Sequence, residues 1–580
     1  MTVKGRRIFN RRPVCFFAFF LAAGILVAEA FYAIPHLYRL IPLLLAVVVT
    51  VSFALKGKLR RAVYLPLAFF VGFLSCTGAA DVYDSRLVED CSGTFTARVS
   101  SDIIVRDGMA EFYVEDLVVD GVVTEGECEV RVPLDVPDFG AGDIVVLKGD
   151  LTASRHEAFD TFFAADALGG TYHSLRAESA EFLAAGEPDA ILKVQLAVAK
   201  LFYENTDADT SAVARALVIG DQRSIDDLYY DSIQASGLAH VLSVSGLHIT
   251  ALSTALYFLL GKLRVNKKAA LVIVLAISLV YVALCDFVPP AVRSLVMTAV
   301  FNFASAFGLK KDSLSSLAAA ASIILVFSPF SVMHVGFLLS VFSIFGILMF
   351  AEPFKRTLMK GVDRAAPPRA EETAVGLHGI AAIQAGDIPE DPLARLVAEK
   401  QAEQAAEEQG KVKGISRLKS RSAKPSASPR ESVPRRALSY AAESVSVSVA
   451  ANLTSMPIAA YFFGKIQTLF ILSNIVILPY TVFIYLVLMI ITPFALITGL
   501  HGIVGVMDYV MLPFSAFVRA VGSISFASVP FAVSVTGVVC TLSAEVVLSR
   551  YLFLKRMERA VAVIALAVLF LIVASVAVAV

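Results

Sequence analysis

Residues 6–31 read RRIFNRRPVCFFAFFLAAGILVAEAF, a basic segment followed directly by a long apolar run. Two more apolar runs follow at once, at about residues 37–55 and 62–80. Apolar runs of about 18 residues or more are long enough to cross a hydrocarbon core of about 30 Å. Because further runs follow immediately, the pattern predicts three transmembrane helices within residues 1–80 and not a cleaved leader.

The composition of the whole chain is that of a membrane protein. Of the 580 residues, 57% are hydrophobic and 17% are charged, and the mean hydropathy is +0.73. Every backbone amide within lipid needs an internal partner, so repeated apolar runs of this length indicate helices. We therefore expect an all-α polytopic membrane bundle of about 12–13 spans, together with one small extracytoplasmic β-barrel domain. The net charge of zero favours no class of partner, since it averages compartments that do not mix.

Basic clusters predict the orientation of the chain. They comprise Arg6, Arg7, Arg11 and Arg12 before the first run, and Lys56, Lys58, Arg60 and Arg61 before the third. Lysine and arginine concentrate in cytoplasmic loops. The N-terminus is therefore expected in the cytoplasm, and three crossings place residue 81 outside.

Residues 81–185 differ in character from the runs that precede them. Alternating stretches such as GTFTARVS, AEFYVEDLVV, ECEVRV and DIVVLKGDL are separated by the turn formers RDG, VDG and PDFGAGD. Alternation with a period of two predicts the strands of a small antiparallel barrel or sandwich. Cys91 and Cys128 are the cysteines of this block. Outside the membrane they could form a disulfide or remain two free thiols, and both alternatives are open.

Residues 186–235 have helical spacing with one charged face, which fits amphipathic helices along the membrane interface or ordinary helices of the outer insert. Residues 352–436 are acidic at first and basic later, and they contain too few apolar residues to fold. They are predicted to form a disordered, charged cytoplasmic linker. Five spans are expected in residues 236–351, at about 237–260, 269–285, 290–307, 313–327 and 332–351.

Residues 437–580 are expected to supply four or five further spans, the last at 561–580. The run LSNIVILPYTV in this part is interrupted by Asn474 and Pro479. Broken or polar-studded helices occur at membrane depth only where protein or a water-filled cavity faces them. Each half of the bundle is thus expected to hold one irregular, polar element.

The other irregular element is SGLAHVLSVSGLHIT, residues 236–250, which has two histidines, three serines and two glycines. Ser245 and His248 are three residues apart, which on one helix would make them neighbours, as an intramembrane serine hydrolase requires. His240 and His248 could bind a metal only with ligands from elsewhere, and no carboxylate or cysteine lies near at ligand spacing. Intramembrane ionisable groups cost about 2.5–3.5 kcal/mol each and usually face a bundle interior or a cavity. We therefore favour a polar lining for something that crosses the membrane.

Arg293, in FVPPAVRSLVMTAV, belongs to the same class of costly intramembrane groups. Neither catalytic residues nor metal ligands are expected. The sequence also lacks the GxxxxGK[ST] phosphate loop of ATP-binding proteins. The candidates for lining or shaping the path are Gly237, His240, Ser243, Ser245, Gly246, His248, Arg293, His334 and Asn474.

Four stretches resemble, in order, the core motifs of the ComEC family of bacterial inner-membrane competence proteins. They are ALVIGDQRSID, SGLAHVLSVSGLHIT, PPAVRSLVMT and DSLSSLAAAASIILVFSPFSVMHVGFLLSVFSIFGIL. HEAFDTFFAADALGG is similar to the end of the family's outer OB-like domain, and LTSMPIAAYFFGKIQTLFILSNIVILP to the second half of its core. The resemblance implies an inner-membrane channel that takes single-stranded DNA into the cytoplasm during natural transformation. A channel or transporter for a smaller anionic solute is the alternative, and an intramembrane serine hydrolase comes third.

The sequence departs from the family pattern in three respects, of which the first is the linker at residues 352–436 that interrupts the core. Long members carry a C-terminal metallo-β-lactamase-like domain, whereas no HxHxDH run occurs here, so a short form without nuclease activity or cofactor is expected. Between residues 81 and 181 there are 22 acidic residues and seven basic ones, which is unfavourable for binding a polyanion. Besides DNA and membrane lipid, the implied partners are a cytoplasmic helicase-type ATPase, outer DNA-receptor proteins and a separately encoded nuclease.

Overall fold

The computed structural model describes residues 2–3, 6–7, 12–32, 64–106, 108–133, 138–156, 160–308, 312–365, 433–531 and 533–548. The runs expected at 37–55 and 561–580, and most of the expected linker at 352–436, lie outside these residues. The chain divides into two compact units. The first comprises Met1–Phe350 and Ser448–Val580, and the second comprises Ala351–Val447.

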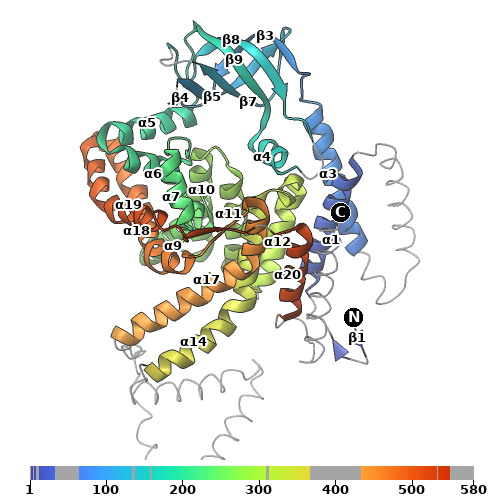
Figure 1. Ribbon diagram of the computed structural model, residues 1–580, viewed down its shortest axis with the longest axis vertical. Coiled ribbons are helices and arrows are strands. Elements are labelled where there is room, and N and C mark those ends of the chain that lie inside the picture. Colours follow the sequence, from blue (N-terminus) through green and yellow to red (C-terminus); the bar gives the residue numbers. More distant parts are fainter. Residues whose placement is uncertain are drawn as a thin grey trace, which may run out of the picture. The chain divides into compact units, whose positions relative to one another are not determined.

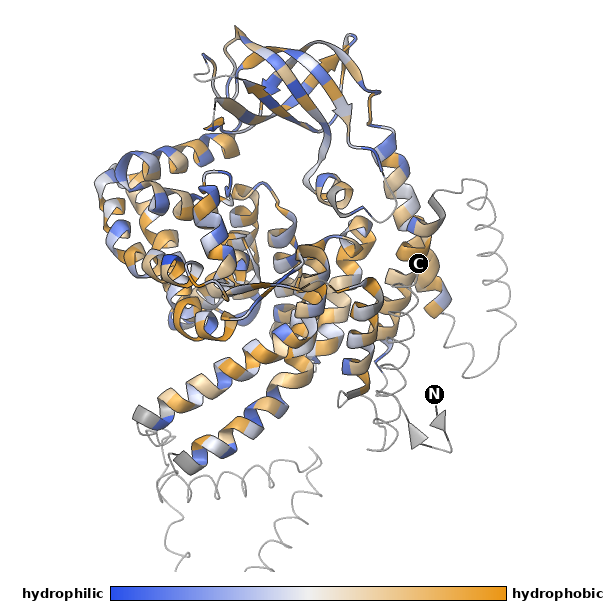
Figure 2. Cartoon of the chain, in the orientation of Figure 1, coloured by the Kyte–Doolittle hydropathy of each residue, from blue (hydrophilic) through white to orange (hydrophobic). Residues whose placement is uncertain are grey.

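Helices dominate the described residues, as the composition predicts. Among the residues that the structure describes, seven helical stretches are long and apolar enough to cross a membrane: Pro13–Ala30, Tyr64–Asp84, Lys267–Leu284, Val335–Asp363, Ala437–Phe463, Phe470–Thr498 and His501–Gly522. Hydrophobic residues cover much of these helices, whereas hydrophilic and hydrophobic residues alternate along the strands (Figure 2). The chain is thus a mostly helical membrane protein with a small sheet domain.

Helices α1 (Pro13–Tyr32) and α3 (Tyr64–Asp84) pack in close contact through a reciprocal pair of glycines. A Cβ atom at Gly24 would lie 1.9 Å from the carbonyl oxygen of Phe69, and one at Gly72 would lie 2.1 Å from that of Leu21. Small residues of this kind let two membrane helices approach closely. Near the end of α1, the fully buried Glu29 contacts the Cys76 thiol of α3 (3.2 Å) and His156 Nε2 (3.1 Å).

The sheet domain contains seven strands. The order is β3-β8-β9-β7-β5-β4, and because β3 also pairs with β5, the path from β3 through β8, β9, β7 and β5 returns to β3. All pairs are antiparallel except β7 and β9, which are parallel. Helix α4 (Thr161–Gly169) joins β8 to β9 (Figure 1). The strands are β3 (Cys91–Val99), β4 (Ile104–Arg106), β5 (Met109–Val119), β6 (Val122–Val123), β7 (Glu127–Pro133), β8 (Ile144–Ala153) and β9 (Thr171–Ala184).

The alternative of a disulfide between Cys91 and Cys128 is wrong for this structure, in which both are free thiols. Cys91 begins β3 and stands opposite Leu151 of β8. Cys128 is buried in β7, between Val114 of β5 and His173 of β9. The physical reason is the strand order, because β3 and β7 are not neighbours in the sheet.

The next helices form the first half of the helical core. They are α5 (Ala190–Asn205), α6 (Ala208–Ile219), α7 (Asp227–Ala235), α8 (Ala239–Leu242), α9 (Gly246–Lys262), α10 (Lys267–Leu284), α11 (Pro289–Ala306), α12 (Ser313–Phe327), the 3-10 turn η3 (Pro329–Val332), α13 (Val335–Gly346), the π turn η4 (Ile347–Ala351) and α14 (Glu352–Ala365). The interpretation of residues 186–235 as helices with one charged face is wrong for α6, which is buried on every side from Thr210 to Ile219. The reason is tertiary packing, since its residues join one core cluster with α5, α10, α18 and α19.

The second half of the core comprises α17 (Val433–Phe463), β10 (Lys465–Gln467), α18 (Phe470–Thr498), the 3-10 turn η6 (His501–Gly505), α19 (Val506–Gly522), β11 (Ser528–Pro530) and α20 (Val535–Leu548). Helix α18 is continuous through Asn474, Pro479 and Pro493, so the expected interruption there is wrong. Within the second unit, Lys355 pairs with Glu443 (2.9 Å). Near the N-terminus, β1 (Thr2–Val3) pairs with β2 (Arg6–Arg7).

Candidate functional site

The polar stretch at residues 236–250 is an interrupted helix. Helix α7 ends at Ala235, and Gly237 adopts a left-handed backbone with φ of 77°, a conformation that glycine reaches without a steric penalty. One turn, α8, follows, and the chain is then extended at Ser243 and Ser245 before α9 begins at Gly246. The prediction of one continuous span over residues 237–260 is therefore wrong.

Side chains hold this interruption in place by pairing with backbone groups that a regular helix would satisfy. Ser473 Oγ of α18 donates to the carbonyl oxygen of Ser236 (2.6 Å), across a buried contact between the two halves of the core. Ser243 Oγ donates to the carbonyl oxygen of His240 (3.2 Å). His240 Nδ1 lies 3.0 Å from the carbonyl oxygen of Gly237. The irregular backbone is thus a fixed feature of the fold.

Access differs along the interruption. His240 and Gly246 are exposed, whereas Gly237, Ser243 and Ser245 are half-buried. The polar face of the break is therefore open on the side of His240 and Gly246.

His248 serves the start of α9. Ser245 is the residue before the helix, and its backbone N–H donates to His248 Nδ1 (3.0 Å), as in one half of a capping box. Ser245 Oγ is 3.4 Å from the same ring nitrogen. His248 is 1% exposed, its ring lies 4.7 Å from that of Tyr485, and Nε2 has no hydrogen-bond partner among the described residues. A hydrolytic triad would need an acceptor at Nε2 to orient the ring. The geometry therefore favours a capping role over hydrolysis.

Arg293 lies in the first turns of α11 and is only 4% exposed. Its Nε and Nη1 atoms have no hydrogen-bond partner among the described residues, and no described carboxylate lies within ion-pair distance of the guanidinium. A Cβ atom at Gly336 would lie 2.9 Å from Arg293 Nη2 and 3.0 Å from the ring of His334. The guanidinium therefore abuts the first turn of α13, where His334 Nδ1 accepts from the Gly336 N–H (3.1 Å).

Three helices of the core begin at one end of the bundle. Short connections join α9, α10, α11, α12 and α13, so successive helices alternate in direction and α9, α11 and α13 start together. Ser294 Oγ of α11 lies 3.6 Å from the position of a Cβ atom at Gly246, the first residue of α9. Helix N-termini carry about half a positive charge each. Positive helix ends therefore gather around Arg293 and the interruption.

The structure does not group every predicted residue there. It brings together Ser245 with His248, Gly246 with α11, and Arg293 with His334. Asn474 contacts α17 instead, where its Nδ2 donates to Ser448 Oγ (3.2 Å). Within the described residues, no three His, Cys, Asp or Glu side chains come together as a metal site.

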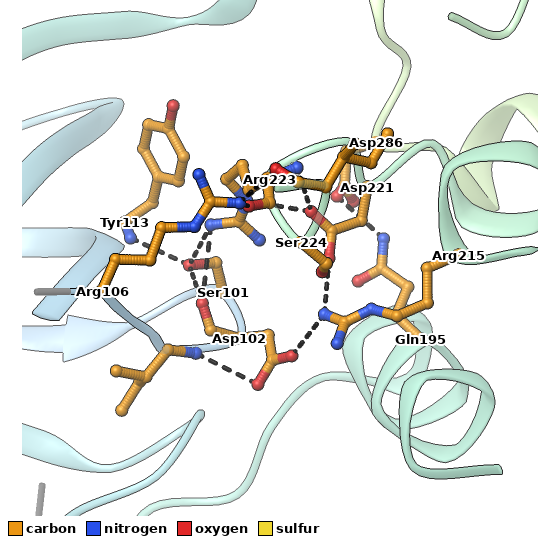
Figure 3. Close-up of polar contacts among 12 residues, drawn as sticks. Ser101, Asp102, Arg106, Tyr113, Gln195, Arg215, Asp221, Arg223, Ser224 and Asp286 are labelled. Atoms are coloured by element: carbon orange, nitrogen blue, oxygen red, sulfur yellow. Dashed lines mark hydrogen bonds and ion pairs between the residues drawn. The ribbon is translucent and has the colours of Figure 1, made fainter. Parts of the chain in front are cut away.

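A second polar cluster, which the sequence does not predict as a site, joins the sheet domain to the helical core (Figure 3). We call Asp102, Arg106, Arg215, Asp221 and Arg223 the junction cluster. Arg215 is 8% exposed, and its Nη2 contacts Asp102 Oδ2 (2.7 Å) and Asp221 Oδ2 (2.5 Å). Arg223 Nε donates to Asp221 Oδ1 (3.2 Å). Arg106 donates to the carbonyl oxygens of Arg223 and Ile225.

Asp221 is the centre of the junction cluster. Burial opposes its ionisation, but Arg223 and Arg215 outweigh that effect and hold the pKa of its carboxyl below the usual value. Beside the cluster, Gln195 Nε2 donates to Asp286 Oδ2 (2.8 Å), which also fixes the connection between α10 and α11. Asp221 and Arg223 belong to the motif ALVIGDQRSID, and this motif was the available sequence signal. Through the hydrogen bond between Gln195 and Asp286, the connection before α11 is held against α5.

The pKa of Glu127 in β7 is raised by its surroundings, and the effect of this shift on stability can be tested. Burial, followed by the carboxylates of Asp286 and Glu115, raises the pKa of Glu127 to about 7. In the unfolded chain the pKa of a glutamate is about 4.3, so the folded protein binds more protons between these two values. Its stability therefore falls as the pH rises through this window, and the full penalty is present above about pH 7.

We expect Glu127→Gln to raise the thermal unfolding midpoint at pH 8 and to leave it almost unchanged at pH 4. Melting curves of the purified protein at the two pH values measure this difference. Glu125→Gln, which alters a side chain that is 74% exposed, is the matched control and should shift neither midpoint. Equal shifts of the unfolding midpoint at both pH values in the Glu127→Gln variant would contradict a raised pKa of Glu127.

These features define a polytopic membrane protein with an interrupted, polar core helix and a small sheet domain. A profile of the competence protein family matches residues 217–375 and 415–557, just over half of the chain. The chain therefore belongs to the competence protein family, and the resemblance to ComEC proteins is confirmed. The matched residues include the interruption, Arg293 and His334.

Two curated relatives are similar over shorter segments. ComE operon protein 3 of Bacillus subtilis (strain 168) is 25% identical over 148 residues, which cover 26% of this chain and 19% of that protein. Competence protein ComA of Neisseria gonorrhoeae is 29% identical over 144 residues, covering 23% of this chain and 20% of that protein. The matched segments thus span about a fifth of each relative's length. No solved structure matches the chain.

Proposed function

We propose that this protein is a channel of the bacterial inner membrane that takes single-stranded DNA into the cytoplasm during natural transformation. Family membership supports a role in competence, and both relatives are named for competence or for a Com operon. The observation that carries the proposal is the buried Arg293, which lies beside the interruption among the N-termini of α9, α11 and α13.

The arrangement suits an anionic substrate for an electrostatic reason. Each nucleotide of the strand carries about one negative charge, which is costly to move into a medium of low dielectric. Helix N-termini that point at anionic groups are a recurring device of membrane transporters. An irregular backbone at membrane depth also requires either protein packing or a water-filled cavity beside it. The open side of the interruption, at His240 and Gly246, is accordingly proposed as a wall of the path.

The orientation and the outer domain complete the proposal. The N-terminus lies in the cytoplasm and the sheet domain lies outside, as the basic clusters suggest. We infer an OB-like barrel for the sheet domain. The returning path of β3, β8, β9, β7 and β5 supports this inference, because OB folds are five-stranded Greek-key barrels. Because the sheet domain is rich in acidic residues, we propose that it docks on the helical core or on a receptor protein and does not bind DNA directly.

The energy for inward movement is proposed to come from partners. Moving one negative charge into a cell held at about −100 mV costs about 2.3 kcal/mol when the charge is unscreened. A cytoplasmic helicase-type ATPase supplies the pull, outer DNA-receptor proteins deliver the strand, and a separately encoded nuclease degrades the complementary strand.

Gly246→Leu tests the channel. The position is exposed, and a Cβ atom there meets only Ser294 Oγ at 3.6 Å, which is an ordinary van der Waals contact. The leucine side chain narrows the open side of the interruption, and we expect transformation to fall to background while the protein level in the membrane is unchanged. The matched control is Gly261→Leu on the same helix, where no neighbouring atom lies within 4 Å of an added Cβ atom. Cells that carry this control variant should transform normally.

Normal transformation of the Gly246→Leu variant would contradict the proposal. Transport assays in vesicles that contain the purified protein distinguish the DNA channel from a channel for a smaller anionic solute. Entry of a labelled single strand supports the DNA channel, whereas flux of small anions without DNA entry supports a channel for a smaller anionic solute.

A further inference from the structure

Arg293 has no counter-ion in the part of the chain that the structure describes. The guanidinium is buried, two of its three nitrogen atoms lack hydrogen bonds, and no described acidic residue forms an ion pair with it. A buried charge is normally paired, because removing it from water is otherwise strongly unfavourable. This site therefore lacks the negative partner that its burial calls for.

The groups around Arg293 increase this imbalance. The start of α13 faces the guanidinium and carries the positive end of a helix of 12 residues. In that turn the Gly336 N–H donates a hydrogen bond to His334 Nδ1. Next to Arg293 on its own helix, Ser294 Oγ donates to the carbonyl oxygen of Pro290. Two positive groups therefore meet in a buried place with no anion between them.

None of three acidic residues that could be considered as partners forms an ion pair with Arg293 among the described residues. Asp286, before α11, accepts a hydrogen bond from Gln195 (2.8 Å). Asp312, before α12, pairs with Arg12 (2.8 Å). Glu545 of α20 is buried, but it forms no ion pair with Arg293. The missing anion is therefore not supplied by these carboxylates.

We propose that Arg293 and the first turn of α13 form a buried binding site for one phosphodiester group. A guanidinium presents two parallel N–H donors that match two phosphate oxygens, and the positive dipole end of α13 favours the same group. The biological ligand rests on the proposed function, in which the phosphodiester belongs to the incoming strand. A phospholipid headgroup offers the same chemistry, and the experiment separates the two sources.

The test uses the full-length protein in a maltoside detergent that contains no phosphate. The probes are dimethyl phosphate, a fluorescent oligothymidylate and phosphatidylglycerol, with binding followed by anisotropy and thermal unfolding. Arg293→Met removes the charge and keeps the length of the side chain. Arg293→Lys keeps the charge but loses the paired donors. The matched control is Arg155→Met, which removes an exposed guanidinium that pairs with Asp90.

We expect dimethyl phosphate to raise the melting temperature of the wild-type protein and to compete with the oligothymidylate. Arg293→Met should weaken the binding of both probes by about tenfold or more, Arg293→Lys should weaken it less, and Arg155→Met should leave it unchanged. Without ligand, Arg293→Met should melt at a higher temperature than the wild type, because an unpaired buried charge has been removed. A structural role for Arg293 would give the opposite sign.

Four outcomes distinguish a failure of this site from a failure of the proposed function. Wild-type affinity for dimethyl phosphate in both Arg293 variants would overturn the site, and so would a lower melting temperature of ligand-free Arg293→Met. Binding of dimethyl phosphate and phosphatidylglycerol through Arg293, without binding of oligothymidylate, would support the site and reject the DNA channel. Loss of transformation in Gly246→Leu together with unchanged oligothymidylate binding in Arg293→Met would support the channel and reject the site.

Discussion

Replacing Arg215 with alanine is expected to lower the free energy of unfolding by about 1.5–3 kcal/mol, because the buried carboxylate of Asp221 loses one of its two guanidinium partners and keeps only that of Arg223. The side chain of Asp221 is 9% exposed, so water cannot replace the guanidinium there, whereas that of Asp102 is 35% exposed and can be hydrated. Most of the loss should therefore come from Asp221. Chemical unfolding of the detergent-purified protein measures the change.

A second substitution identifies the source of this loss. In the double variant Arg215→Ala and Asp221→Asn, the buried group that lost Arg215 no longer carries a charge, and part of the stability should return. The control is Lys193→Ala, which breaks an exposed pair with Glu187 and should cost about 1 kcal/mol or less. An Arg215→Ala variant as stable as Lys193→Ala would show that the junction cluster contributes little.

The sequence predicts the bounds of some core helices well, although seven candidate spans are found among the described residues where about 12–13 were expected for the whole chain. Helix α12 has the expected bounds of residues 313–327, and α11 differs from the expected segment by one residue at each end. The strands of the sheet domain were equally predictable, since alternation along β5 and β8 follows directly from burial of one face. In both cases a single physical constraint acts locally along the chain.

The interruption at residues 236–245 depends on contacts that hydropathy does not record. Gly237 adopts a left-handed conformation at the interruption. The hydrogen bond from Ser473 to Ser236 joins segments that are far apart in the sequence. The opposite error occurred at Pro479, where the missing N–H and the polar Asn474 suggested a break. Membrane helices tolerate proline when neighbouring groups satisfy the freed backbone, and α18 stays continuous.

The junction cluster was missed for a related reason. Its members come from the sheet domain and from the segment around α6, and only folding brings Asp102 to Arg215. Sequence patterns mark Arg293 as an unusual intramembrane charge but give no partner for it. Its position against Gly336 required the packing of α11 on α13.

Gly346→Ala is expected to destabilise the protein by about 1–3 kcal/mol or more through overpacking. A Cβ atom at Gly346 would lie 2.3 Å from the carbonyl oxygen of Ala450 and 2.3 Å from Thr454 Oγ1. The carbonyl belongs to the backbone, so the clash is relieved only if α13 separates from the 448–463 part of α17. Thr454 Oγ1 also donates to the carbonyl oxygen of Phe342 (2.6 Å), which holds the same interface closed.

The matched control is Gly78→Ala in α3, where no atom lies within 4 Å of the added methyl group. It should stabilise the protein by up to about 1 kcal/mol, since alanine is the better helix former. The same chemical change is thus expected to have opposite signs in the two helices, as thermal unfolding would measure. Because α13 begins at the turn that abuts Arg293, Gly346→Ala should also reduce transformation, whereas Gly78→Ala should not. Stabilisation by both substitutions would mean that α13 and α17 are not in close contact at Gly346.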